Sequence, residues 1–218
     1  FTLSAKTEAA LRAYAGAYAD FLAGPKTAAL SEIASAQART RSHYDHRLAV
    51  ACSSAEELRD ALRDVARGAD PEGLHRGVKA SGASNVAFVF SGQGPPWWGM
   101  GRELLAQNKV FRQTVERVDA ELRRHADWSV LEELNRDEGE SRIGETFIAQ
   151  PAVFAIQVGL AALWQSWGIT PAAVVGHSIG EVAAACVSGA LSFEDAVRVI
   201  YHRSRVQQQA SGKGTMLA

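Results

Sequence analysis

The first part of the chain shows apolar residues at helical spacing and one short run typical of a strand. Four apolar residues recur at steps of three and four: Leu11, Tyr14, Tyr18 and Phe21. This stripe predicts an amphipathic helix over about 6–23, and a second helix is expected over about 26–38. The segment 47–52 predicts a strand. Ser53 and Ser54 then offer caps for a third helix, whose apolar stripe is Leu58, Leu62 and Val65.

The pattern changes after a stretch near 70–84 that is rich in glycine and other helix breakers. The residues 86–90 form an unbroken apolar run, which is typical of a strand buried on both faces of a parallel sheet. Helices are expected over about 99–125 and 150–167, and a further strand over 171–175. This alternation of strands and helices predicts the α/β class.

The breakers near 70–84 also predict a domain boundary. We expect a small α/β unit over 1–80 and a larger α/β unit over 85–218. The residues 1–80 contain no recognisable nucleophile, metal cluster or phosphate-binding loop, so the candidate chemistry lies in the larger unit.

Composition and charge narrow the class of protein. Hydrophobic residues make up 47% and charged residues 22%, as in ordinary globular domains, and the formal net charge is −1. No nucleic-acid partner is expected, because the basic excess of such proteins is missing. No membrane span is expected, because the most apolar stretch, 152–164, is shorter than the roughly 20 residues that a span needs. The start at Phe1, without Met or a basic leader, favours a segment cut from a longer protein.

The two cysteines, Cys52 and Cys186, lie far apart and lack metal-like spacing. We expect free thiols in a reducing compartment, which favours a cytoplasmic protein. For Cys186, burial among apolar neighbours is the preferred interpretation.

The segment Gly176-His177-Ser178-Ile179-Gly180 follows an apolar strand and precedes a run of small residues suited to a closely packed helix. This order is typical of a nucleophile elbow, a turn so tight that large side chains two residues before or after the serine would clash. The turn projects the Ser178 hydroxyl toward substrate. The helix start adds the Ile179 N–H where negative charge develops on an attacked carbonyl.

Four motifs together resemble those of polyketide synthase acyltransferase domains and the related malonyl-CoA:acyl carrier protein transacylases. They are Phe90-Ser91-Gly92-Gln93-Gly94, Ala149-Gln150-Pro151-Ala152, Gly176-His177-Ser178-Ile179-Gly180-Glu181 and His202-Arg203-Ser204. The resemblance covers about 85–218, and the first 80 residues resemble the small α/β linker between a ketosynthase and an acyltransferase. It implies a parallel-sheet, α/β-hydrolase-like core whose ferredoxin-like subdomain is largely missing; 212–218 resemble the first strand of that subdomain.

The resemblance implies roles for the residues around the elbow. Ser178 would carry the acyl group, and Gln93 with the Ile179 N–H would form the oxyanion hole. The alternative for Gln93 is an ordinary turn glutamine. His177, a candidate substrate-binding residue beside the nucleophile, is interpreted as shaping the elbow and not as the general base.

Two further residues would bind the acyl group. By resemblance, Arg203 binds the free carboxylate of a malonyl-type group, and a guanidinium matches a carboxylate in a bidentate way that lysine cannot reproduce. The alternative is a solvated helix arginine. Gln150 would lie near the acyl pocket, but its place before Pro151 fits a helix cap equally well. Ile179 after the serine, where methylmalonyl-using relatives commonly have glutamine, favours malonyl.

The implied reaction is ping-pong acyl transfer. The thioester of malonyl-CoA acylates Ser178, coenzyme A leaves, and the phosphopantetheine thiol of an acyl carrier protein takes the acyl group. No metal and no bound cofactor are expected. The implied partners are the acyl carrier protein and an upstream ketosynthase domain of the same polypeptide, in a homodimeric parent synthase.

A serine nucleophile needs a base, usually histidine, within hydrogen-bond reach. In the family this histidine lies well downstream of the serine, beyond the ferredoxin-like subdomain. The histidines of this chain are His43, His46, His75, His125, His177 and His202, and none matches that position. We therefore expect the chain alone to transfer acyl groups poorly.

Two other functions remain open at this point. A serine hydrolase such as a thioesterase uses the same elbow with water as the acceptor, but it does not account for the combination of Gln93, Gln150 and Arg203. A non-catalytic docking fragment of a megasynthase is consistent with the missing base.

Overall fold

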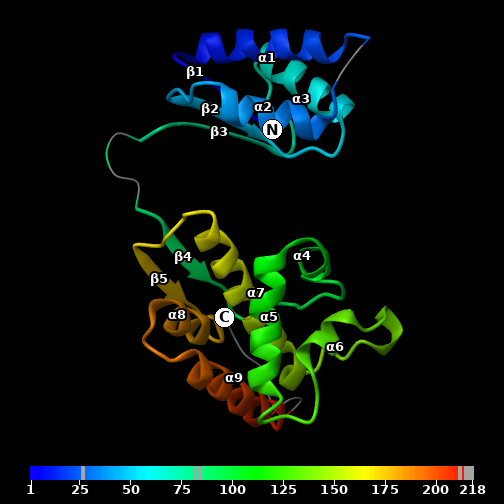
Figure 1. The fold of residues 1–218 in the computed structure, drawn as a ribbon, viewed down its shortest axis with the longest axis vertical. Helices are drawn as coiled ribbons and strands as arrows, with labels where there is room; N and C mark the ends of the chain where they lie inside the picture. The colour runs from blue at the N-terminus through cyan, green and yellow to red at the C-terminus, as the bar shows by residue number, and fades with distance from the viewer. Residues whose placement is uncertain (26–27, 81, 83–84, 211–212, 214–218) are drawn as a thin grey trace. The chain divides into compact units, whose positions relative to one another are not determined.

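The chain folds into two compact units, which we describe separately. The computed structural model describes residues 1–25, 28–80, 82, 85–210 and 213, and the units are Phe1–Ser84 and Asn85–Ala218 (Figure 1). Each unit has its own hydrophobic core. The expected helix start at 26–27 lies outside the described residues, as does the strand expected at 212–218, of which only Lys213 is described.

The smaller unit pairs an antiparallel sheet with helices. Its strands are β1 (Thr2–Ala5), β2 (His46–Val50) and β3 (Leu74–Val78), in the order β1-β2-β3. Its helices are α1 (Glu8–Leu22), α2 (Leu30–Thr40) and α3 (Ala55–Arg67). The predicted elements are confirmed with shifted ends, and Ser54 caps α3 by accepting a 3.1 Å hydrogen bond from the Glu57 N–H. β3 was not predicted, because four of its five residues are exposed and it lacks apolar alternation.

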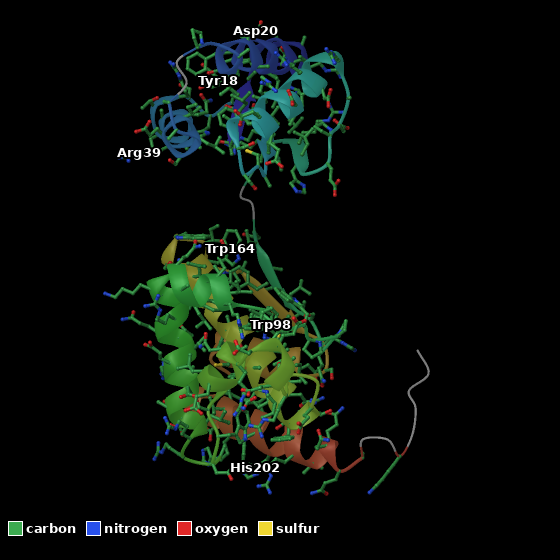
Figure 2. The ribbon with its side chains drawn as sticks, turned by 90° about the vertical axis from the view of Figure 1, so that its right-hand side faces the viewer. Tyr18, Asp20, Arg39, Trp98, Trp164 and His202 are labelled. Atoms are coloured by element: carbon green, nitrogen blue, oxygen red, sulfur yellow. The ribbon has the colours of Figure 1, made fainter. Side chains whose placement is uncertain are left out.

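The buried face of α1 differs from the predicted stripe. Its buried residues are Leu11, Ala15, Ala19 and Leu22, whereas Phe21 is 54% exposed. The alanines allow α1 to pack closely on α3, whose predicted stripe is buried as expected. Tyr14 and Tyr18, of which Tyr18 is labelled in Figure 2, instead donate hydrogen bonds to Gln37 Oε1 of α2, at 3.3 and 2.8 Å. A tyrosine hydroxyl needs a polar partner of this kind, so both rings lie at the edge of the core.

The larger unit is built around two parallel strands, β4 (Ala87–Phe90) and β5 (Ala173–Gly176). Between them along the chain come α4 (Arg102–Gln107), α5 (Lys109–Leu122), α6 (Val130–Asn135), the 3-10 helix η1 (Glu138–Glu140) and α7 (Thr146–Ser166). After β5 come α8 (Gly180–Ser188) and α9 (Phe193–Gln208). α7 packs against α5, α8 and α9 (Figure 1). The predicted α/β class is confirmed.

The helix expected over 99–125 is in fact two helices, α4 and α5. They are separated at Asn108, whose φ and ψ of −115° and 115° are extended. Asn108 Oδ1 accepts a 3.0 Å hydrogen bond from the Phe111 N–H and thereby caps α5. Because an asparagine side chain competes for backbone groups in this way, it ends one helix and starts the next within a continuous apolar pattern.

α7 begins at Thr146, four residues before the expected start, and contains Pro151. Proline favours the first turn of a helix, which is why the sequence pattern placed the start near 150. By length and composition α7 could cross a membrane, which the shorter apolar stretch in the sequence did not suggest. However, 67% of its most apolar window is buried inside the protein. In the described residues α7 is therefore a core helix of the larger unit.

The parallel sheet is covered less completely than predicted. Val89 is 76% exposed and Val175 is 55% exposed, whereas Phe88 and Val174 pack against the core and Phe90 is buried. The apolar run at 86–90 therefore alternates between a covered and an open face within the described residues. The prediction of a strand buried on both faces is wrong here, because only one face of the pair meets helices of this unit.

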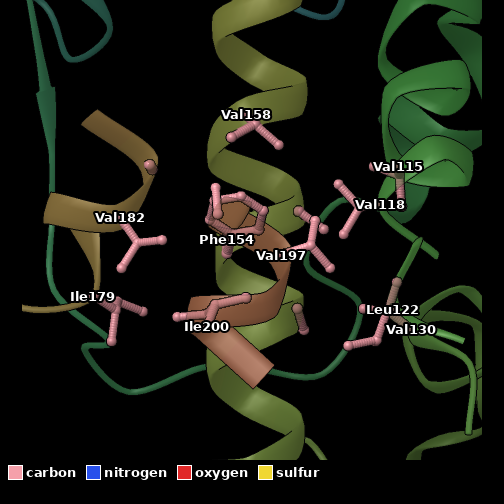
Figure 3. Packing of buried hydrophobic residues seen from close by; sticks show 14 of the residues in the cluster. Val115, Val118, Leu122, Val130, Phe154, Val158, Ile179, Val182, Val197 and Ile200 are labelled. Atoms are coloured by element: carbon pink, nitrogen blue, oxygen red, sulfur yellow. The ribbon is translucent and has the colours of Figure 1, made fainter. Parts of the chain in front are cut away.

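The core of the larger unit lies along α7. Phe154 and Val158 of α7 share one cluster with residues of three other helices (Figure 3): Val115, Val118 and Leu122 of α5, Val197 and Ile200 of α9, and Ile179 and Val182 at the start of α8. This packing fixes α7, α8 and α9 relative to one another. These helices carry Gln150, the turn at Ser178, and Arg203.

The contact of α5 with α7 yields a prediction about stability. A Cβ at Gly159 would lie 2.8 Å from Phe111 Cε2, and the Phe111 ring is fully buried. Alanine favours a helix over glycine by about 1 kcal/mol. We nevertheless expect Gly159→Ala to destabilise the protein by about 1–3 kcal/mol in urea unfolding, because the packed core prevents the ring from moving away.

Gly144→Ala is the matched control, since a Cβ there meets nothing within 4 Å. It should change the free energy of unfolding by less than about 0.5 kcal/mol. A Gly159→Ala protein that is as stable as the unchanged protein contradicts the prediction.

Candidate active site

A tight turn between β5 and α8 carries Ser178. β5 ends at Gly176 and α8 begins at Gly180, so the chain changes direction within three residues. Ser178 has a φ of 56°, the only positive φ of a residue other than glycine in the described part of the chain. A residue held in this left-handed region stores about 1–3 kcal/mol of strain. Such strain at a strand-to-helix turn is the geometry of a nucleophile elbow.

The glycines around this turn are required by close backbone contacts. A Cβ at Gly176 would lie 2.3 Å from the carbonyl carbon of Gly180, and a Cβ at Gly180 would lie 2.2 Å from Phe90 O. A Cβ at Gly92, at the end of β4, would lie 2.8 Å from His177 Nδ1. Because real Cβ atoms do not approach other atoms this closely, each position admits only glycine without a shift of the backbone or of the His177 ring.

The start of α8 leaves the Ile179 backbone N–H free beside the serine. The Gly180 N–H donates to His177 O at 2.9 Å, and the Glu181 N–H donates to Ser178 O at 3.1 Å. The Ile179 N–H donates no hydrogen bond within the described residues, while the Ile179 side chain is fully buried. This N–H can therefore donate to an anion at Ser178, as an oxyanion hole requires.

α9 brings Arg203 to the serine. Arg203 Nη2 donates a 3.0 Å hydrogen bond to Ser178 Oγ, and Nη1 donates a 2.6 Å hydrogen bond to Gln150 Oε1. The Arg203 side chain is half-buried. Since a guanidinium is not deprotonated in proteins, the arrangement places a permanent positive charge next to the Ser178 hydroxyl.

Gln150 connects the remaining candidate residues. Its side chain is fully buried, and its Nε2 donates to Gln93 Oε1 at 3.1 Å and to Gln207 Oε1 at 2.8 Å. Because Gln150 lies within α7 and not at its N-terminus, the alternative of a helix cap is wrong. Gln207 was not predicted. Its position four residues after Arg203, on the same face of α9, is the signal that could have found it.

The histidines near the site make no hydrogen bond to Ser178. His177 is exposed and its ring lies beside Gly92. His202, also exposed (Figure 2), lies 5.0 Å from the ring of Tyr201 and 6.4 Å from that of His125, measured between ring centroids. Within the described residues, Arg203 is the only side chain that bonds to Ser178 Oγ, and a guanidinium cannot accept the proton.

Cys186 does not compete as a nucleophile. It lies in α8, half-buried and without a disulfide partner in the described residues. Burial raises the pKa of its thiol, so the reactive thiolate is disfavoured at neutral pH.

The geometry thus combines a strained serine, a free N–H and a cation. The family described as "Acyl transferase domain" matches residues 87–218, more than half of the chain. The chain belongs to this family. A second family, described as "CurL-like, PKS C-terminal", matches residues 1–62 of this acyl transferase chain, within the smaller unit.

Relatives of this acyl transferase chain are modular polyketide synthases. It is 42% identical over 217 residues to erythronolide synthase EryA2 of Saccharopolyspora erythraea and to pikromycin polyketide synthase component PikAIII of Streptomyces venezuelae. The matches cover 99% of this chain, but only 6% and 13% of those proteins. The chain therefore spans a small part of the length of these synthases.

Solved structures of acyltransferases are similar in fold. The acyltransferase domain from module 8 of the salinomycin polyketide synthase has a TM-score of 0.84 and 37% identity, with 96% of this chain and 49% of that chain covered. The malonyl-CoA:ACP transacylase of Synechocystis sp. PCC 6803 has a TM-score of 0.51 and 32% identity, with 59% of this chain and 42% of that chain covered. The chain spans about half of these solved chains or less.

The close contacts of the turn yield a second prediction. Gly180→Ala places a Cβ 2.2 Å from Phe90 O and 2.5 Å from Ser91 O, so the turn must move away from the end of β4. In the polypeptide that carries these residues, we expect Gly180→Ala to abolish covalent labelling of Ser178 by a fluorophosphonate, because the hydroxyl leaves its position beside the Ile179 N–H. Gly144→Ala is again the control and should label normally. Normal labelling of Gly180→Ala would show that the close contact does not fix the serine.

Proposed function

We propose that Ser178 takes a malonyl-type acyl group from coenzyme A and passes it to the phosphopantetheine thiol of an acyl carrier protein. The observation that carries this proposal is the 3.0 Å hydrogen bond from Arg203 Nη2 to Ser178 Oγ. It combines a nucleophile with a fixed cation, and a carboxylated acyl group attached to Ser178 would lie beside that cation.

The first half of the reaction forms the acyl-enzyme. Ser178 Oγ attacks the thioester carbonyl, its proton passes to a base, and the carbonyl oxygen becomes an oxyanion. The Ile179 N–H and the Gln93 amide donate to this oxyanion. The tetrahedral intermediate then collapses, the C–S bond breaks, and coenzyme A leaves as its thiol after taking up the proton.

The second half repeats these steps with another thiol. The phosphopantetheine thiol gives its proton to the base and its sulfur attacks the Ser178 ester, while the same donors stabilise the second oxyanion. The C–Oγ bond then breaks, and Oγ takes the proton to become the serine hydroxyl again. The net reaction moves the acyl group from one thiol to another, so no metal and no bound cofactor is needed in the proposal. The pantetheine arm arrives with the carrier protein.

Recognition of the acyl group would rest on Arg203. Its guanidinium can bind a carboxylate through two parallel hydrogen bonds, and its Nη1 is already held by Gln150 Oε1 at 2.6 Å. The related acyltransferase domain of SpnD was solved in complex with 2-(pent-4-yn-1-yl)malonyl, at 33% identity and a TM-score of 0.79. Malonyl is the preferred acyl group in this proposal, because Ile179 stands at the position where methylmalonyl-using relatives commonly have glutamine.

The proposed reaction needs a general base for the Ser178 proton, and none of the side chains that hydrogen-bond to Ser178 in the described residues can serve as that base. Arg203 cannot accept the Ser178 proton, and no histidine of the described residues bonds to Oγ. We therefore propose that the 218 residues alone transfer acyl groups poorly. The base would come from a group that makes no hydrogen bond to Ser178 in the described residues.

The neighbouring domains and partners in this proposal are taken from the polyketide synthases to which the chain is similar. We propose that the smaller unit is the linker that follows a ketosynthase domain in the same polypeptide, and that the acyl carrier protein is the acceptor partner. A homodimeric parent synthase in the cytoplasm completes this proposal. The match of residues 1–62 and of the whole chain to segments of polyketide synthases supports the linker and the carrier-protein partner in this proposal.

A serine hydrolase is the rival function, because the elbow and the oxyanion donors suit attack by water equally well. Arg203 and its contact to Gln150 favour acyl transfer of a carboxylated group, since a thioesterase elbow does not require them. Measuring whether the acyl group of the acyl-enzyme passes to a pantetheine thiol or to water separates the two.

A non-catalytic docking fragment is the other rival. It would bind the carrier protein without taking up an acyl group, so a pull-down of carrier protein together with an absence of acyl-Ser178 would favour it.

The nucleophile assignment predicts a covalent intermediate. In the polypeptide that carries these residues, incubation with radiolabelled malonyl-CoA should acylate Ser178, and Ser178→Ala should abolish the label, because no other nucleophile in the described residues has an elbow and a free N–H beside it. Peptide mapping by mass spectrometry locates the acyl group. Ser91→Ala is the control and should retain the label; undiminished labelling of Ser178→Ala would exclude this serine.

The carboxylate assignment predicts a change in selectivity. Arg203→Ala should lower malonyl loading by about 10- to 100-fold, as expected for loss of a charge-assisted contact. Acetyl loading should fall much less, because acetyl has no carboxylate. Arg198→Ala, on the same helix but paired with Asp195 at the surface, is the control and should change neither rate. An equal loss of malonyl and acetyl loading would contradict the assignment.

A further inference from the structure

Gln207 lies one helical turn after Arg203 on α9 and contacts the same buried amide. Gln207 Oε1 accepts a 2.8 Å hydrogen bond from Gln150 Nε2. Arg203 Nη1 donates a 2.6 Å hydrogen bond to Gln150 Oε1. The two residues of α9 therefore hold opposite ends of the Gln150 amide, Gln207 its donor end and Arg203 its acceptor end.

The hydrogen bonds determine the orientation of this amide. Both N–H groups of Gln150 Nε2 have an acceptor, Gln93 Oε1 at 3.1 Å and Gln207 Oε1 at 2.8 Å. If the amide turned over, its NH2 group would face the guanidinium of Arg203, which has only donors. The NH2 group of the fully buried Gln150 would then have no acceptor at that end, which is costly. Each acceptor on Nε2 thus helps to keep Gln150 Oε1 directed at Arg203.

We propose that Gln207 is a positioning residue for acyl-group selection. It fixes the Gln150 amide, which in turn fixes the Arg203 guanidinium beside Ser178 Oγ. The same bond pattern occupies Gln93 Oε1 and leaves the Gln93 NH2 group for an oxyanion. This inference rests on the proposed function, because the effect of Gln207 on substrate follows from carboxylate binding by Arg203.

The neighbouring glutamine separates positioning from a general structural role. Gln208 Oε1 accepts a 3.3 Å hydrogen bond from the Phe147 N–H in the first turn of α7. Gln208 therefore connects α9 to α7 as Gln207 does, but among the described residues it makes no hydrogen bond to Gln150 or Arg203. If the glutamines merely join the two helices, loss of either one should have the same effect.

The test measures binding, so that the base is not needed. In the polypeptide that carries these residues, Ser178→Ala prevents acylation, and calorimetry gives the Kd of malonyl-CoA and of acetyl-CoA. Gln207→Met keeps the length of the side chain but replaces the carbonyl acceptor by a weakly accepting thioether. Gln207→Ala is a second variant, and Gln208→Met is the matched control.

We expect Gln207→Met and Gln207→Ala to weaken malonyl-CoA binding about fivefold, the loss typical of one hydrogen bond. Acetyl-CoA binding should change less than twofold, and Gln208→Met should leave the ratio of the two affinities unchanged. An unchanged ratio in both Gln207 variants overturns the positioning role, as does an equal shift of the ratio in Gln208→Met. A Ser178→Ala protein that does not prefer malonyl-CoA overturns the proposed substrate, and with it this inference.

Discussion

The candidate site depends on one close backbone contact, between the start of α8 and the end of β4. Gly180 lies so near the Phe90 and Ser91 carbonyls that a Cβ would come within 2.5 Å of both oxygens. This contact joins β4, β5 and α8 at one point and forces the chain through a turn in which Ser178 has a φ of 56°. The strain is offset by burial, since Ile179, directly after the serine, is fully enclosed in the core with Val182. Burial of one such side chain contributes about 1.5–3 kcal/mol, which matches the strain.

The second half of the site comes from the packing of α7 on α9. Their shared core places a glutamine of one helix against an arginine and a glutamine of the other, with every polar atom of the Gln150 side chain bonded. A buried amide whose polar atoms are all hydrogen-bonded has one favoured orientation, because the other leaves donors or acceptors without partners. The elbow holds Ser178 by steric exclusion, whereas the polar network holds Arg203 by hydrogen-bond matching. The two mechanisms meet at the bond between Arg203 and Ser178.

The sequence predicted those parts of the structure that are set by residues close together along the chain. The elbow, the cap at Ser54 and the buried stripe of α3 follow from spacing and residue type. The buried face of α1 did not, because partner helices selected its alanines over the larger Tyr14 and Phe21. The exposed face of Val89 was missed because an apolar run does not reveal what covers it. The hydrogen bond between Gln207 and Gln150 joins residues 57 positions apart. Spacing along α9 places Gln207 on the face of Arg203, but it carries no information about Gln150 on α7.

The contact of Arg203 with Ser178 also shows that stabilising the Oγ anion and accepting its proton are separate tasks at this serine. The guanidinium donates to Oγ and favours its anionic form, but it cannot take the proton. Recognition of an acyl carboxylate and activation of the hydroxyl must therefore use different groups. The described residues provide donors around Ser178 from two directions: the Ile179 N–H and Arg203 Nη2. An elbow with donors alone does not determine whether water or a thiol is the acceptor. In the proposed function, the cation of Arg203 selects acyl groups that carry a carboxylate, and this selectivity does not require the base.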